Sequence, residues 1–186
     1  ALGADRSVHL SDNAPVGSDI STTGLALAKV LESENPDVVL LGQQSDDGEC
    51  YTIGAVVADH LKMPSLTQVV KMDVEDGKLR CERQAEYGYD TVSLSLPAVI
   101  AVGDAINEPR YPSLKAIMGA KKKPLDTKSA GDVGIDAGQV GEAGSQTTVI
   151  ALNPPPEKQA GEIIEDEDTN ETVEKIVAWL DERKLI

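Results

Sequence analysis

The stretch "VVLLGQQSDDGECYTIG", residues 38–54, carries the clearest pattern of secondary structure in the chain. It opens with an unbroken apolar run that ends in Gly42, which is typical of a strand buried on both faces of a sheet. A polar loop follows, and from Ile53 to Leu61 the apolar residues recur at helical spacing, before Pro64 ends the pattern. A buried strand, a loop and a helix in this order predict an α/β protein with parallel strands.

Residues 7–37 contain an earlier copy of the same unit. The sequence "SVHL", residues 7–10, predicts a short strand, and we expect Ser18 to cap the helix that follows a turn. The apolar positions of that helix recur at helical spacing: Ile20, Gly24, Leu27 and Leu31. Two strand–helix units in succession predict a doubly wound, mainly parallel sheet.

The pattern becomes antiparallel after residue 69. Two alternating runs flank Asp76-Gly77, a dipeptide typical of the type I′ turn of a hairpin. The sequences "TVSLSLP" (91–97) and "AVIAV" (98–102) predict two further strands. We therefore expect an antiparallel hairpin insertion joined to the parallel sheet.

The last third of the chain has a different character. Residues 124–144 are rich in Gly and Asp without periodicity, and "TTVIALN" (147–153) predicts a lone strand before an extended linker. A final helix begins after a cap at Asp168, Thr169 or Asn170, with Val173, Ile176, Val177 and Leu180 on one face. We divide the chain into an α/β domain, 1–123, and a C-terminal arm, 124–186, that packs on another surface; a loose, partly disordered tail is the alternative.

Composition excludes several classes of protein. The formal net charge of -15 argues against nucleic-acid binding, which needs clustered cations. No apolar run approaches the roughly 20 residues of a membrane span, so we expect no membrane insertion. With Cys50 and Cys81 alone, no disulfide framework or zinc motif is available, and a reducing cytoplasm is expected. The opening "ALGAD" has no Met and looks like the end of a helix, so we expect a segment upstream.

The loop that starts at Gly42 is a candidate nucleotide site. Ligands of doubly wound sheets bind at the carboxyl ends of the strands. The amides of residues 50–53 would form a helix N-terminus that attracts a phosphate, with the Thr52 hydroxyl beside them. Because no P-loop and no G-x-G-x-x-G motif is present, an ordinary surface loop remains the alternative.

Catalytic signals are weak. His9 and His60 lack a metal-like spacing, and Cys50 has no His or second Cys near it in sequence. No nucleophile–base pair and no carboxylate pair stands out. The sequence therefore predicts a protein that is not a catalyst on its own.

The stretch "NEPRYPSLKAIMGAKKK", residues 107–123, is a basic island in this acidic chain. Two prolines stiffen it, and Leu114, Ile117 and Met118 lie close to the three lysines at its end. A rigid loop with apolar anchors and surrounding charge favours a protein interface. The alternative is a loop that folds its own Leu and Ile onto the core.

These stretches resemble the beta subunit of electron transfer flavoprotein. The resemblance covers "ALGAD", "PDVVLLG", "LPAVIAV" and above all "NEPRYPSLKAIMGAKKK", in order along nearly the whole chain. The family pattern also fits Arg83, Glu86, Gly88, Val92, Pro97, Val99 and Ile100, and departs from this sequence at Cys81, Tyr87 and Asp90. The resemblance also implies that the family's first roughly 70–80 residues, which include its opening strand, are absent here.

The resemblance implies a Rossmann-like, adenine-nucleotide-binding fold and an obligate heterodimer with an alpha subunit that holds most of the FAD. The beta subunit of this family binds a structural AMP, or a second FAD in electron-bifurcating members; we expect AMP. Carried over to this sequence, the site comprises Gly42, Gln43, Gln44, Ser45, Asp47, Gly48, Glu49, Cys50, Tyr51, Thr52 and Ile53. The usual side chains differ at Tyr51, Thr52 and Ile53, whereas the backbone donors are retained.

The resemblance also assigns partners. The family accepts electrons from flavoprotein dehydrogenases, such as the acyl-CoA dehydrogenases of fatty acid beta-oxidation, and passes them through a quinone oxidoreductase to the quinone pool. Leu114 matches the anchor of its recognition loop, and the C-terminal arm would wrap the alpha subunit. The docking residues are Arg110, Tyr111, Leu114, Ile117, Met118, Lys121, Lys122 and Lys123.

Two other functions compete with this one. A stand-alone nucleotide-binding regulator of the universal-stress type would explain residues 1–61, but neither the arm nor the basic loop. An enzyme that transfers adenylyl groups on a PP-loop-type sheet would need a Ser-Gly-Gly-type loop, which this sequence lacks.

Overall fold

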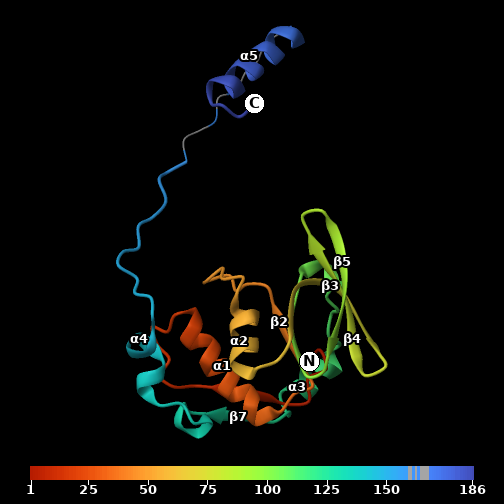
Figure 1. The fold of residues 1–186 in the computed structure, drawn as a ribbon, viewed down its shortest axis with the longest axis vertical. Coiled ribbons are helices and arrows are strands. Elements are labelled where there is room, and N and C mark those ends of the chain that lie inside the picture. The colour runs from red at the N-terminus through yellow and green to blue at the C-terminus, as the bar shows by residue number, and fades with distance from the viewer. Residues whose placement is uncertain (159–160, 162, 164–167) are drawn as a thin grey trace. The chain divides into compact units, whose positions relative to one another are not determined.

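A computed structural model describes residues 1–158, 161, 163 and 168–186. The chain forms two units, Ala1–Thr148 and Val149–Ile186 (Figure 1). Residues 124–148, which the sequence assigned to the arm, thus lie in the same unit as the α/β domain. Among the described residues, no helix is long and apolar enough to cross a membrane.

A five-stranded sheet forms the centre of the first unit, in the order β2-β6-β3-β4-β5. Strands β2 (Val38–Gly42), β6 (Ala98–Val102) and the start of β3 (Ser65–Glu75) are parallel. Strands β4 (Lys78–Ala85) and β5 (Gly88–Ser95) continue the sheet antiparallel to β3. The predicted α/β class, with parallel strands and an antiparallel insertion, is confirmed.

The hairpin between β3 and β4 has the predicted turn. Asp76 and Gly77 have φ values of 50° and 72°, the left-handed pair that a type I′ turn requires. Beyond it, Leu79 and Cys81 of β4 are fully buried against Leu66 and Ile100. The alternating run therefore buries one face of the ribbon and exposes the other.

Two helices cover one face of the parallel strands. Helix α1 spans Ile20–Glu34 and helix α2 spans Ile53–Leu61, where Lys62 in a left-handed conformation ends it. They pack on each other closely at Gly24, where an added Cβ would lie 2.4 Å from Cγ1 of Val56. Helical spacing in the sequence predicted both helices correctly.

Two details of these units differ from the prediction. Asp19, and not Ser18, caps α1, because its carboxylate accepts a hydrogen bond from the Thr22 amide at 2.9 Å. The run 38–42 is not buried on both faces: β2 is an edge strand of its sheet, and the Leu40 side chain is 55% exposed.

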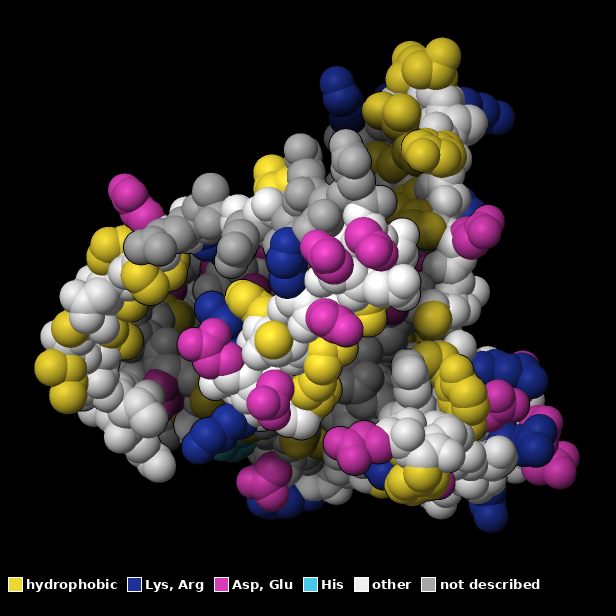
Figure 2. Space-filling model, turned by 90° about the horizontal axis from the view of Figure 1, so that it is seen from above, with side chains coloured by type: hydrophobic (Ala, Val, Ile, Leu, Met, Phe, Trp, Pro, Cys, Tyr) yellow, Lys and Arg dark blue, Asp and Glu magenta, His cyan; other side chains and the backbone are white. Residues whose placement is uncertain are grey.

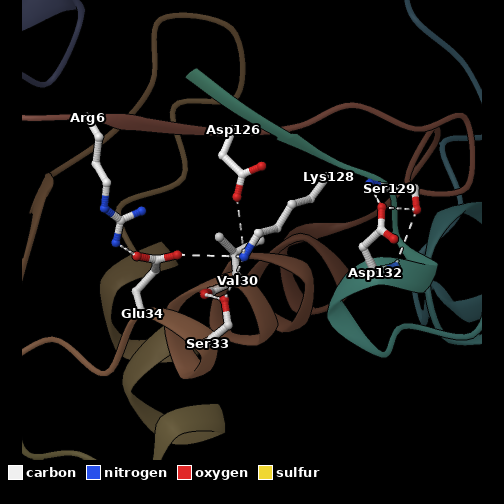
Figure 3. Close-up of polar contacts among 8 residues, drawn as sticks. All are labelled: Arg6, Val30, Ser33, Glu34, Asp126, Lys128, Ser129 and Asp132. Carbon is white, nitrogen blue, oxygen red and sulfur yellow. Dashed lines mark hydrogen bonds and ion pairs between the residues drawn. The ribbon is translucent and has the colours of Figure 1, made fainter. Parts of the chain in front are cut away.

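The chain also forms a second, two-stranded sheet, of which the sequence predicted only the first strand. Strand β1 (Ser7–Leu10) pairs in parallel with β7 (Leu125–Lys128), which lies in the stretch expected to be irregular. The Glu34 carboxylate at the end of α1 pairs with Arg6 and lies 3.7 Å from Nζ of Lys128 (Figure 3). Lys128 also lies 3.9 Å from Asp126 and donates to the Ser33 hydroxyl at 3.2 Å. These contacts join both strands to the helix between β1 and β2.

Short helices follow in the remaining chain. They are η1 (Asp104–Ile106), α3 (Leu114–Ala120), η2 (Gly131–Val133), η3 (Ala137–Gln139) and α4 (Gly141–Gly144). Buried Ala130, Ile135 and Val140 pack on Ala26 of α1, which explains why this stretch belongs to the first unit.

The second unit contains helix α5, Thr169–Glu182, whose cap is Asp168 as predicted. Its apolar face is exposed at Val173, Ile176 and Val177, and Arg183 lies over the Trp179 ring at 4.1 Å. The strand predicted over 147–153 is absent, since residues 147–153 have no regular structure. Val149, Ile150 and Leu152 are all exposed there.

Candidate functional site

The candidate nucleotide loop connects β2 to α2 at the carboxyl end of the parallel strands. Gly42 ends β2 and Ile53 begins α2, so residues 43–52 form the loop. The loop closes on itself, because the Glu49 amide donates to the Ser45 carbonyl at 2.9 Å and the Cys50 thiol donates to the Gly48 carbonyl at 3.1 Å. The loop is thus a compact turn in front of the helix.

One cavity, of about 470 Å³, lies between this loop and the start of α1. Its loop side is formed by predicted residues: Gly42, Gln44, Ser45, Asp47, Gly48, Cys50 and Ile53. Its other side is formed by Leu41 and by residues that the sequence analysis did not assign to the nucleotide site: Ser18, Asp19, Ile20, Thr23 and Leu27. The sequence feature that could have indicated these residues is the predicted start of a helix at the carboxyl edge of the sheet, because such helix ends line ligand sites in this class of fold.

A second cavity, of about 640 Å³, shares Gly42 and Gln44 with the first. It brings the predicted Gln43 and Tyr51 together with Gln68, Val102, Gly103 and Asp104. Gly103 lies under Gln43, since an added Cβ would be 3.0 Å from the side-chain nitrogen of Gln43. Residues 102–104 lie at the carboxyl end of a parallel strand, so the rule that indicated Gly42 as a site residue applies to them as well. Nothing in the sequence indicated Gln68, whose φ is 60°, as a site residue. Glu49 and Thr52 line neither cavity.

Two helix N-termini lie at the first cavity, and a side chain caps only one of them. The Asp19 carboxylate caps α1, whereas the Thr52 side chain makes no capping hydrogen bond to α2. The first turn of α2 also contains no acidic residue. The N-terminus of α2 therefore presents free amides and the positive end of the helix dipole, the combination that binds phosphate.

The acidic residues of the cavity are held by the chain itself. Hydrogen bonds from the Ser45 hydroxyl and the Gly48 amide lower the pKa of Asp47 below its usual value. Hydrogen bonds from Thr22 and from the backbone of Gln146 and Thr147 lower the pKa of Asp19 further. Both carboxylates are therefore ionised at neutral pH.

The predicted docking loop is exposed. Tyr111, Leu114 and Met118 are 99%, 80% and 71% exposed, and Ile117 is 42% exposed. Ser113 caps α3 by accepting from the Ala116 amide at 3.2 Å. The alternative in which Leu114 folds onto the core is therefore wrong: α3 has no buried residue.

The cations of this loop differ from one another. Arg110 donates to the Leu2 carbonyl at 3.1 Å, and Lys123 donates to the Ala4 carbonyl, so both fix the loop to the first residues of the chain. Among the described residues, Lys121 and Lys122 form no ion pair and are exposed. On the face seen in Figure 2, acidic side chains are scattered among basic and hydrophobic ones.

The fold and its cavities define an α/β protein with a ligand-sized site at the carboxyl ends of parallel strands. Residues 1–133 match the electron transfer flavoprotein domain family. The chain is 41% identical, over 187 aligned positions, to electron transfer flavoprotein subunit beta of Mycobacterium tuberculosis, and covers 70% of that protein. It is 37% identical to the bovine subunit beta, with 98% of this chain and 68% of the relative covered.

A third relative is subunit CarD of the caffeyl-CoA reductase-Etf complex of Acetobacterium woodii. It is 35% identical over the whole of this chain and 71% of its own length. The chain therefore belongs to the electron transfer flavoprotein family, with the beta subunits as its relatives, and the resemblance found in the sequence is confirmed.

Proposed function

We propose that the chain is the beta subunit of a heterodimeric electron transfer flavoprotein and binds AMP at the α2 N-terminus. The carrying observation is the uncapped start of α2 beside a cavity of about 470 Å³. The amides of Ile53 and its neighbours hold the phosphate, and Gly42, Ser45 and Gly48 allow the ligand to approach the loop backbone. The AMP is structural and takes no part in electron transfer.

The redox chemistry belongs to the pair of subunits. FAD, held mainly by the alpha subunit, accepts electrons from a flavoprotein dehydrogenase and delivers them towards a quinone oxidoreductase. This chain contributes docking and assembly, and is not a catalyst on its own. Both of its cysteines are free, which agrees with a role in a reducing cytoplasm.

Docking uses the loop 107–123. An exposed leucine on a capped, proline-flanked helix is a rigid anchor for a pocket on the dehydrogenase. Lys121 and Lys122, which form no ion pair among the described residues, attract an acidic partner surface. The alpha subunit covers the exposed apolar residues of the arm and of α5, among them Ile150, Ile176 and Val177.

The test is to purify the chain with its alpha subunit, denature the complex and identify the released nucleotides. We expect FAD and AMP in equal amounts. Release of FAD alone, at two per pair, would replace AMP by a second FAD in the beta site. A flavin-free chain that purifies as a dimer without an alpha subunit would contradict the carrier function and support the nucleotide-binding regulator.

A further inference from the structure

The last residues of the first unit, which lead into the arm, are held by a cluster of hydrogen bonds at the start of α1. From here on the arm means the second unit, Val149–Ile186, and we call residues 145–147, near the end of the first unit, the arm root. Oδ2 of Asp19 accepts from the amides of Gln146 and Thr147 at 2.8 and 3.1 Å. It also accepts from the Thr147 hydroxyl at 3.2 Å.

The same carboxylate caps α1 with its other oxygen. Oδ1 of Asp19 accepts from the amide and the hydroxyl of Thr22, each at 2.9 Å. One side chain thus joins the first turn of a helix to a segment more than 120 residues later in the chain. Because both oxygens are used, a shorter or neutral side chain cannot replace all of these contacts.

A second set of contacts holds the arm root from the other side. The Ser145 hydroxyl accepts from the Asp19 amide at 2.9 Å and donates to the Gly141 carbonyl at 2.6 Å. The Ser18 hydroxyl accepts from the Gly141 amide at 2.7 Å. This explains why Ser18 does not cap α1: its side chain is bonded to the segment that leads into the arm.

Beyond the arm root, the first apolar residues of the arm are exposed. The side chains of Val149, Ile150 and Leu152 are 74%, 96% and 89% exposed. The arm therefore starts from a fixed point and continues as a chain whose apolar residues are available to a partner. A fixed starting point lowers the conformational entropy that is lost when a tethered segment binds.

We propose that Asp19 is the positioning residue of the C-terminal arm. By holding residues 145–147 on the end of α1, it sets the point from which the arm leaves the α/β unit and strengthens binding of the partner subunit. The identity of that partner, an electron transfer flavoprotein alpha subunit, rests on the proposed function. The hydrogen bonds between Asp19 and residues 145–147 are independent of the proposed function.

The variant that tests this is Asp19→Asn. It retains an oxygen to cap α1 but places an amide NH₂ opposite the donors of Gln146 and Thr147. Asp12→Asn is the matched control, because Asp12 also accepts from a local amide, of Ala14 at 3.0 Å, and from a distant one, of Ala130 at 2.8 Å. Its distant contact lies inside the unit and not at the arm root.

The first measurement is hydrogen exchange of the full chain without a partner. In Asp19→Asn we expect the amides of Gln146 and Thr147 to exchange at least about tenfold faster, as hydrogen-bonded amides do once their acceptor is lost. Asp12→Asn should leave these two amides unchanged and accelerate Ala130 instead. If the Gln146 and Thr147 amides exchange in Asp19→Asn at the wild-type rate, Asp19 does not hold the arm root.

The second measurement is affinity for the alpha subunit. We expect Asp19→Asn to weaken binding by about threefold to tenfold, since the net loss of an ordinary hydrogen bond has effects of this order. Ile176→Asp, on the exposed face of α5, should weaken it as well. In the Ile176→Asp background, Asp19→Asn should then have little further effect, because both act through the arm.

Fully additive losses would overturn the proposal, because Asp19 would then act through the α/β unit. Failure of the proposed function gives a different result. If no variant binds an alpha subunit, the carrier function and the effect on affinity are both contradicted, while the exchange rates still decide whether Asp19 holds the arm root.

Discussion

Asp19 and Thr52 are the N-cap residues of two neighbouring helices, and only Asp19 caps its helix with its side chain. Asp19 and Ile53, the first residue of α2, line the same cavity. At α1 the carboxylate satisfies the Thr22 amide. At α2 the Thr52 side chain forms no capping hydrogen bond, so the first amides of that helix have no acceptor at the cap residue. The difference supports the proposed phosphate site at α2 and the proposed role of Asp19 at the arm root.

Cys50 should report on this binding. It is exposed and lines the cavity, whereas Cys81 is buried, so a thiol reagent should modify Cys50 first in the folded chain. Saturating AMP should slow modification of Cys50 at least about tenfold, as expected for a thiol covered by bound ligand. Mass spectrometry after timed labelling measures the rate at each cysteine.

The control is Cys81, whose modification should depend on unfolding and not on AMP, because burial shields it and raises its pKa. An equal Cys50 rate with and without AMP would contradict the site at the α2 N-terminus.

Gly24→Ala should destabilise the chain although alanine favours helices. The new Cβ would lie 2.4 Å from Cγ1 of Val56, so α1 and α2 must separate. We expect a loss of about 1–3 kcal/mol in the free energy of unfolding, as for other overpacked cores. Urea denaturation followed by circular dichroism measures it.

Gly119→Ala is the matched control, since nothing lies within 4 Å of the Cβ added in α3. It should be neutral or stabilising by up to about 1 kcal/mol. A Gly24→Ala variant as stable as Gly119→Ala would show that the two helices are not closely packed at this point.

Local signals predicted most of the elements. Asp76-Gly77, Pro64 and Asp168 each mark a turn or a helix end through the chemistry of their own residues, and the structure agrees at all three. The strand over 147–153 failed because β-branched residues favour a strand only where a neighbouring strand pairs with it. Strand β7 was missed because its partner, β1, lies more than a hundred residues earlier in the chain.

The choice between Ser18 and Asp19 as the cap of α1 also needed the tertiary structure. Both residue types cap helices well. The Gly141 amide engages Ser18, and the arm root needs a second acceptor oxygen, which only Asp19 provides. For the site, the loop from Gly42 to Ile53 was predicted because it is continuous, whereas Gln68 and Gly103 reach the second cavity only through the pairing of β6 with β3.

Acid should destabilise the chain through a small set of carboxylates. Hydrogen bonds lower the pKa values of Asp12, Asp19 and Asp132 below the ordinary value of 3.8. The unfolded chain then binds more protons than the folded chain, so their stabilisation is complete above about pH 5 and is lost as pH falls through the folded pKa values. The urea concentration at half-unfolding, measured at a series of pH values from 3 to 7, should decrease once the pH is below about 4.

Asp19→Asn should show a shallower fall than the wild type, because one of the linked carboxylates is gone. Asp104→Asn, at a residue outside these hydrogen bonds, should keep the wild-type slope. Parallel curves for Asp19→Asn and the wild type would contradict the role of this carboxylate.

Leu114→Ala tests the docking anchor. Since Leu114 is 80% exposed, its loss should change stability by less than about 0.5 kcal/mol and leave FAD content unchanged. Reduction of the flavin by the dehydrogenase should slow by about tenfold or more, the usual effect of removing an interface anchor. Stopped-flow flavin absorbance measures it.

Leu125→Ala is the control, because Leu125 is similarly exposed, at 63%, but lies on β7 outside the loop. Transfer at the wild-type rate in Leu114→Ala would remove this residue from the interface.

Lys121 and Lys122 should act on the rate of encounter with the dehydrogenase. Both are exposed and without an ion pair among the described residues, and they stand out from a chain of net charge -15. Steering by such charges weakens with salt, because the screening length falls from about 30 Å at 0.01 M to about 10 Å at 0.1 M. The second-order rate of flavin reduction should therefore decrease as ionic strength rises, and the Lys121→Gln, Lys122→Gln double variant should be slower and less sensitive to salt.

Lys62→Gln, which removes an exposed lysine paired with Asp59, should keep the wild-type dependence. If the double variant has the wild-type salt dependence, these lysines contribute to solubility and not to docking.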